Sequence, residues 1–115
     1  MSKYDWDAER LGDQSGRVAI VTGANSGIGF ETARVLASKG ATVIMACRNL
    51  DKANPKADEI RARHPGCDVD AMELDLSDLD SVRRFAEAFR AKHSRLDLLI
   101  NNAGVIPRGP ILQTT

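Results

Sequence analysis

Three glycines at positions 23, 27 and 29 are the first residues in this chain whose type and spacing could do chemistry. They follow the apolar residues 18–21 and precede an amphipathic pattern that runs to Lys39 and Gly40. Glycine reaches positive φ without strain and has no side chain, so the turn lets backbone approach a ligand closely. The helix start that follows adds unpaired N–H groups and a positive dipole end, which favour a phosphate. The stretch therefore predicts a strand, a glycine-rich turn and a helix that cradle a phosphate.

Short motifs that begin with a polar residue also follow the three later strands that we expect: Arg48–Asn49, Asp75–Leu76 and the run NNAG at 101–104. The glycine spacing G-x-x-x-G-x-G in TGANSGIG and these three strand ends, taken in order, resemble the short-chain dehydrogenase/reductase family. ACRN at 46–49 is most similar to the retinol-dehydrogenase-like branch. The resemblance covers residues 16–105, nearly the whole chain, and implies a fold that binds a nicotinamide dinucleotide.

The resemblance also implies a role for each of these residues. The glycine-rich turn would line the diphosphate, the Asp-Leu pair would hold the adenine, and the NNAG turn would contact the adenine-side ribose and the path to the nicotinamide. The cofactor-binding residues that it implies are Gly23, Asn25, Ser26, Gly27, Ile28, Gly29, Arg48, Asn49, Asp75, Leu76, Asn101, Ala103 and Gly104.

Plainer interpretations accompany several of these assignments. The glycines could serve only a tight turn and close helix packing, Asp75 could start a turn or helix, and the two roles of Asp75 could coexist. Asn102 is expected to cross-link strands through its side-chain amide instead of binding ligand.

Arg48 bears on which dinucleotide would bind. It stands about where a protein specific for NAD carries an acid that accepts hydrogen bonds from the ribose 2′-OH, and residues 46–49 contain no acid. An arginine instead pairs with a 2′-phosphate, so NADP(H) is expected over NAD(H). The alternative is an arginine that is simply solvated at the end of a strand.

The hydrophobic pattern predicts an α/β fold of alternating strands and helices. We expect strands at residues 17–21, 42–46, 69–74 and 97–100 and helices at 27–39, 51–63 and 79–92. Right-handed crossovers then give a partial doubly wound parallel sheet of order 3-2-1-4 in a three-layer α/β/α arrangement, Rossmann-like. Residues 1–16 form an arm, pinned by Trp6 and Leu11 or frayed, and residues 17–115 form the first half of a dinucleotide-binding domain.

Three local predictions can be checked directly. The second helix is expected to start early enough to keep Pro55 in its first turn, although Asn54 could instead cap a later start. Ser77 and Asp80 are expected to form a capping box. The inward stripes are expected to be Ile28, Thr32, Val35 and Leu36 in the first helix and Leu79, Val82, Phe85, Ala86 and Phe89 in the third.

Composition excludes several classes of function. The 16 basic and 16 acidic residues cancel, so nothing indicates a nucleic acid or an anionic membrane as partner. The apolar runs are too short for a membrane span, and the charged N-terminus excludes a secretory signal. Cys47 and Cys67 are expected to be reduced thiols in a cytoplasmic protein, and His64 and His93 to be surface residues, with no site of metal-ligand spacing.

The residues that would carry out the reaction are not found in the chain. The family transfers a hydride between the cofactor and an alcohol or carbonyl and moves the proton with a tyrosine in a Tyr-x-x-x-Lys motif, aided by a serine. Here the only tyrosine is Tyr4, and no such motif occurs. We therefore expect no catalytic residues, a domain truncated before its catalytic half, and an inactive chain.

Two other functions stay open beside this one. A non-catalytic dinucleotide-binding or partner-dependent interaction module fits the same motifs, whereas a methyltransferase leaves NNAG and Arg48 unexplained. The apolar strand at residues 97–100 would lie at an open sheet edge, which predicts self-association through that strand.

Overall fold

In the computed structural model, which describes residues 12–25 and 27–102, four parallel strands form one sheet of order β3-β2-β1-β4. The strands and helices alternate along the chain, and their bounds are β1 Val18–Thr22, α2 Gly27–Ser38, β2 Thr42–Cys47, α3 Leu50–Arg63, β3 Asp68–Glu73, α4 Leu79–Lys92 and β4 Leu98–Asn101. The predicted order 3-2-1-4 is confirmed. The bounds of all elements lie within one residue of those expected, and α4 has the expected bounds.

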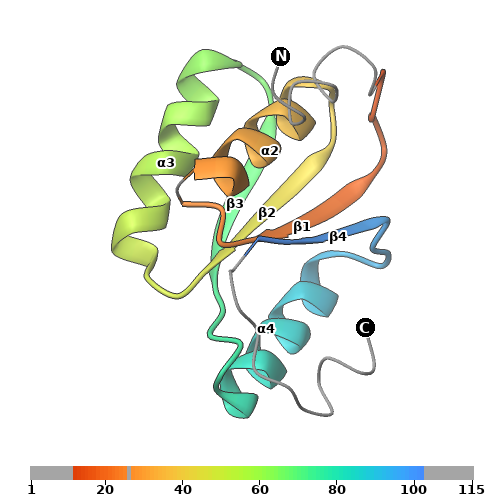
Figure 1. Cartoon of the computed structure of the whole chain (residues 1–115). Coiled ribbons are helices and arrows are strands. Elements are labelled where there is room, and N and C mark those ends of the chain that lie inside the picture. The colour runs from red at the N-terminus through yellow and green to blue at the C-terminus, as the bar shows by residue number, and fades with distance from the viewer. Residues whose placement is uncertain (1–11, 26, 103–115) are drawn as a thin grey trace.

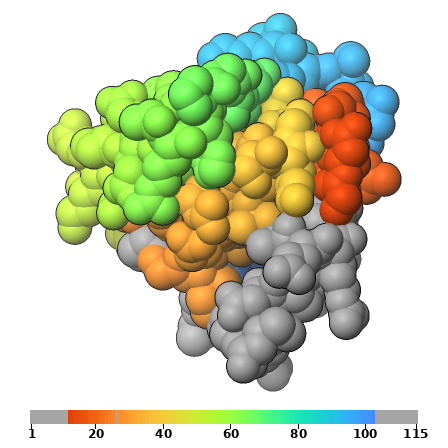
Figure 2. All heavy atoms as spheres, turned by 90° about the horizontal axis from the view of Figure 1, so that it is seen from above, coloured from red at the N-terminus to blue at the C-terminus, as the bar shows by residue number. Residues whose placement is uncertain are grey.

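Helices cover both faces of the sheet, which confirms the three-layer arrangement. Helices α2 and α3 lie side by side on one face, and α4 lies on the other (Figure 1). Figure 2 shows the same pair from above in orange and green. Strand β2 is central and buried along nearly its whole length, as an apolar strand between two helical layers should be.

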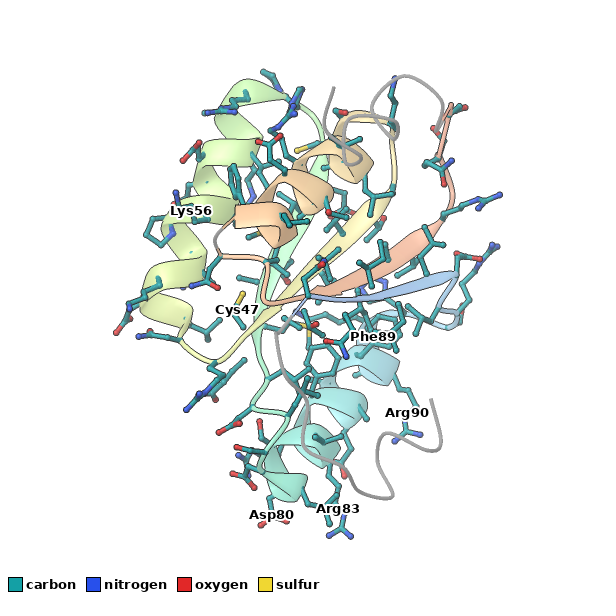
Figure 3. The ribbon with its side chains drawn as sticks, in the orientation of Figure 1. Cys47, Lys56, Asp80, Arg83, Phe89 and Arg90 are labelled. Atoms are coloured by element: carbon teal, nitrogen blue, oxygen red, sulfur yellow. The ribbon has the colours of Figure 1, made fainter. Side chains whose placement is uncertain are left out.

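Each face of the sheet has its own core. Alternate strand residues such as Val21 and Val43 pack against Leu36 of α2 and Ile60 of α3. On the opposite face Ile20 and Ile44 pack against Phe85 and Phe89 of α4, and Figure 3 shows Phe89 between that helix and the sheet. The two cores hold the strand ends in fixed relative positions.

The inward stripe of α2 agrees with the predicted one at Val35 and Leu36, which are buried, but differs from it at the start of the helix. Ile28 is 43% exposed, whereas Phe30 is buried at 8% and Ala33 at 0%. The close packing of Gly29 against the preceding turn places Gly29 and Phe30 inward in place of Ile28, so the difference is at the start of the helix. Leu79 of α4 is likewise 48% exposed, because it stands at the helix start beyond the end of the sheet, while Phe85 and Phe89 are inward as predicted.

The starts of α3 and α4 correct two local predictions. Helix α3 does begin early, with Asn49 as N-cap, but Pro55 is its sixth residue and lies beyond the first turn. Because Pro55 is exposed, water can hydrate the carbonyl that loses its helical partner. Helix α4 is capped by Asp78, whose carboxylate accepts from the N–H groups of Asp80 and Ser81. The prediction of a capping box formed by Ser77 and Asp80 is therefore wrong.

Strand β4 lies at one edge of the sheet in the described part of the chain, where it pairs only with β1. Leu99 in this strand is 50% exposed. The opposite edge strand, β3, carries the acidic residues Asp68, Asp70 and Glu73, which discourage pairing with another chain, whereas β4 has no charged residue. The β3 edge is therefore protected against pairing with another chain, and the β4 edge is not.

Self-association through β4 stays a prediction, and the exposed residues of this edge show which substitution tests it. Raising the protein concentration should increase the sedimentation coefficient, and Leu99→Lys should return the chain to monomer because a charge blocks edge pairing. Leu79→Lys is the matched control, since Leu79 is similarly exposed but lies on α4. A monomer at all concentrations, or an equal effect of both variants, would contradict the prediction.

Candidate functional site

The carboxyl ends of β1, β2 and β3 open onto one cavity of about 1030 Å³. Parallel strands bring all their carboxyl ends to the same sheet edge, and ligands of doubly wound folds bind there. The wall consists of the last residues of these strands, the connections that follow them, the start of α3, two residues of α4 and the residue after β4. They are Thr22, Gly23, Asn25, Ala46, Cys47, Arg48, Asn49, Leu50, Asp51, Lys52, Glu73, Leu74, Asp75, Leu76, Ser77, Asp78, Ser81, Arg84 and Asn102.

The glycine-rich turn owes its shape to close packing at one position and to backbone conformation at another. A Cβ at Gly29 would lie 2.2 Å from the carbonyl oxygen of Gly23, so only glycine lets α2 start this close to the turn. Gly27 has φ +58°, and a Cβ there would meet no described atom within 4 Å. The turn thus leaves open space at the start of α2, which a ligand could fill.

Arg48 lies at the end of β2 with a side chain that is 80% exposed. Its Nε is 3.9 Å from the Asp75 carboxylate, a long ion pair that leaves the guanidinium free to reorient. Asn49, the next residue, caps α3 by accepting a hydrogen bond of 2.9 Å from the Asp51 N–H. Both line the cavity, although Asn49 has this structural role as well.

Asp75 follows β3 and has the turn role that was one of the two interpretations of this residue. One carboxylate oxygen accepts from the Ser77 hydroxyl at 2.6 Å and from the Ser77 N–H at 3.0 Å. These bonds, with a smaller contribution from Arg48, hold the pKa of Asp75 below its ordinary value, so it is ionised at neutral pH. The other oxygen accepts no hydrogen bond from the described residues, which leaves it for a donor such as an amino group.

Thr22 ties the ends of β1 and β4 together. Its hydroxyl, in a residue that is only 4% exposed, donates to Asn101 Oδ1 at 2.8 Å and accepts from the Asn102 N–H at 2.9 Å. Asn102 therefore joins the strands through its main chain, not through its side-chain amide as expected. The Asn102 Nδ2 is buried, lies at the cavity and has no hydrogen-bond partner among the described residues.

The wall also includes a residue that sequence reasoning missed. Cys47 is 3% exposed, and Figure 3 shows it at the end of β2. Burial raises the pKa of its thiol, against the smaller opposite effect of hydrogen bonds from the Ala24 and Asn25 N–H groups, so the thiol is neutral. Its place at the end of a buried strand was the available signal. Thr22, directly before Gly23, was missed in the same way.

The structure brings six of the predicted site residues to the cavity wall: Gly23, Asn25, Arg48, Asn49, Asp75 and Leu76. Gly27, Ile28, Gly29 and Asn101 are not in the wall, although Gly29 and Asn101 hold residues that are. Ser26, Ala103, Gly104 and Tyr4 lie outside the described residues.

Residues 12–25 and 27–102 contain neither a candidate metal site nor a candidate membrane-spanning helix. No group of three or more His, Cys, Asp or Glu side chains there could hold a metal ion. None of the helices in this range is both long enough and apolar enough to span a bilayer.

Comparisons of the sequence and of the structure with known proteins agree with each other. A family model described as short chain dehydrogenase matches residues 17–115. Retinol dehydrogenase 12 from Homo sapiens is 53% identical over 91 residues, which are 79% of this chain and 29% of that protein. The chain thus spans less than a third of the length of this relative.

Two solved structures are similar in both sequence and fold. A metagenomic short-chain oxidoreductase in complex with NADP is 44% identical with a TM-score of 0.73, over 79% of this chain and 40% of that chain. The Pseudomonas aeruginosa RhlG/NADP active-site complex is 36% identical with a TM-score of 0.73, over 81% of this chain and 36% of that chain.

The Thr22 hydroxyl predicts a measurable contribution to stability. Thr22→Val removes the donor to Asn101 and the acceptor for Asn102, which should lower the free energy of unfolding by about 1–3 kcal/mol. Thr22→Ser keeps the hydroxyl, so its loss of unfolding free energy should be less than half that of Thr22→Val. Urea titrations of both variants measure the two losses. A loss in Thr22→Ser as large as the loss in Thr22→Val would contradict a dominant contribution of the hydroxyl.

Proposed function

We propose, since this chain belongs to the short-chain dehydrogenase family, that its cavity binds a nicotinamide dinucleotide and prefers NADP(H) to NAD(H). The observation that carries the preference is Arg48, an exposed cation on the cavity wall at the end of β2. A guanidinium at this place matches a 2′-phosphate, whereas a 2′-OH is bound by an acid.

The charges around Arg48 support this preference. The nearest carboxylate, Asp75, already accepts two hydrogen bonds from Ser77 and is 3.9 Å away, so it competes weakly for the guanidinium. The neighbouring Cys47 is a neutral thiol and adds no negative charge that would repel a phosphate. Two structural neighbours are themselves NADP complexes by description, which agrees with the proposal for this chain.

The remaining wall residues fit the other parts of such a ligand. The open space at Gly27, at the start of α2, suits a diphosphate, which the N-terminal N–H groups of the helix would stabilise. The free oxygen of Asp75 would accept from the adenine amino group, beside Leu76. The unpartnered Asn102 Nδ2 offers a donor at the end of the cavity near β4.

The reaction proposed for the whole family unit is the interconversion of an alcohol and a carbonyl. The bound nicotinamide supplies or accepts the hydride, and the described residues of this chain bind and orient it. Because the chain contains no Tyr-x-x-x-Lys motif, we propose that it does not transfer the substrate proton and is inactive alone. The similarity to retinol dehydrogenase 12 favours a lipophilic alcohol or ketone as the substrate class.

A second candidate function is a dinucleotide-binding module without catalysis. The observation that favours it is that Tyr4 is the only tyrosine in the sequence. Both an inactive chain and such a module should bind NADPH, and neither should reduce NADP⁺ when an alcohol is added. Turnover by the purified chain would contradict both.

The preference predicts the effect of one substitution. Arg48→Gln should weaken NADPH binding about tenfold, the value of one exposed charge-assisted contact, and leave NADH binding within twofold. Isothermal titration of both cofactors measures this. Arg83→Gln is the control, since Arg83 pairs with Asp80 on α4 outside the cavity wall. Equal affinity of the unsubstituted chain for both cofactors, unchanged by Arg48→Gln, would rule out the preference.

A further inference from the structure

Lys52 is a second cation on the cavity wall beside Arg48. Asn49 caps α3, so Lys52 is the third residue of the helix and follows Arg48 by four positions. Arg48 and Lys52 thus bracket the start of α3, and residues 48–52 all contribute to the wall. The cavity receives two positive charges from this one short segment.

The position of Lys52 is electrostatically unfavourable in the protein without ligand. The first turn of a helix presents unpaired N–H groups and the positive end of the dipole, where acidic side chains stabilise and cations destabilise. Asp51 is the only acidic residue in this turn. Among residues 12–25 and 27–102, the Lys52 side chain makes no ion pair within 4.0 Å and no hydrogen bond.

Lys56, one turn further along the same helix, shows the difference. Figure 3 shows Lys56 on α3. Its Nζ lies 3.7 Å from the Glu59 carboxylate and 5.1 Å from the centre of the Phe30 ring. It does not line the cavity. The charge of Lys56 is therefore balanced within the protein, whereas the charge of Lys52 is not.

The distribution of charge around the cavity shows where an anion would bind. Acidic residues lie at Asp51, Glu73, Asp75 and Asp78, and the third cation, Arg84, comes from α4 on the other face of the sheet. Arg48 and Lys52 are the two cations of this wall that come from one short segment, which also contains Asp51. A phosphate monoester carries between one and two negative charges at pH 7, about −1.5 to −2, so it can engage both at once.

We propose that Lys52 is a second specificity-determining residue for the 2′-phosphate and that the ligand-free fold retains it at a cost in stability. The inference rests on the proposed preference for NADP(H) and extends it from one residue to a pair. Arg48 offers a fork of donors to the phosphate oxygens, and Lys52 adds a point charge. The phosphate in turn supplies a second anion beside Asp51 at the start of α3.

Two adenosine nucleotides that differ only in the 2′-phosphate test the proposal on the full chain. Isothermal titration with adenosine 2′,5′-bisphosphate and adenosine 5′-monophosphate measures the contribution of that group. Lys52→Gln should weaken bisphosphate binding about three- to tenfold, within the range of single exposed charged contacts, and leave monophosphate binding within twofold. Lys52→Arg should retain most of the preference, and Lys56→Gln should retain all of it.

Thermal melts supply a readout that a merely structural role would not give. The ligand-free Lys52→Gln variant should melt no lower than the unsubstituted chain. Stabilisation by the bisphosphate should shrink in Lys52→Gln but not in Lys56→Gln. An unchanged ratio of bisphosphate to monophosphate affinity in Lys52→Gln, with the ratio lowered in Arg48→Gln, would overturn the role of Lys52 only. Equal binding of both nucleotides by the unsubstituted chain would overturn the proposed function and this inference together.

Discussion

The contact between the start of α2 and the carbonyl of Gly23 is the constraint on which the rest of the site depends. Because Gly29 has no Cβ, the helix begins directly above the end of β1, and a methyl group there would lie 2.2 Å from the carbonyl oxygen. This approach fixes the rotation of α2, which buries Phe30 and turns Ile28 outward. It also aims the first N–H groups of the helix at the carboxyl edge of the sheet.

The polar residues at that edge are held by one another as much as by the core. Thr22 joins β1 to the residues at the end of β4, and Ser77 holds the Asp75 carboxylate. Asn49 and Asp78 cap the two helices that flank the cavity. The structural and ligand-binding interpretations of these residues are therefore not exclusive, since a wall must be rigid before it can select a ligand. Arg48 and Lys52 are the less constrained residues, and they are the ones that we connect with the 2′-phosphate.

Much of this fold could be predicted from the sequence because its signals are long and mutually consistent. Buried apolar strands alternate with amphipathic helices, and right-handed crossovers then permit few strand orders. Which side of a helix is inward was harder to predict, as Ile28 and Leu79 show, because it depends on packing at the helix end. The roles predicted for Ser77 and Asn102 were also wrong, because several nearby donors compete for the same acceptors. Only the folded geometry decides between them.

The central claim is that the carboxyl edge of this sheet binds a nicotinamide dinucleotide. Titration of the ¹⁵N-labelled chain with NADP⁺, followed by amide NMR, tests it most directly. We predict saturable shifts at Gly23, Arg48 and Leu76, on the cavity wall, and none at Thr42 and Asp68, which begin strands at the opposite edge. The absence of saturable shifts at the wall, or shifts confined to other parts of the chain, would contradict the account.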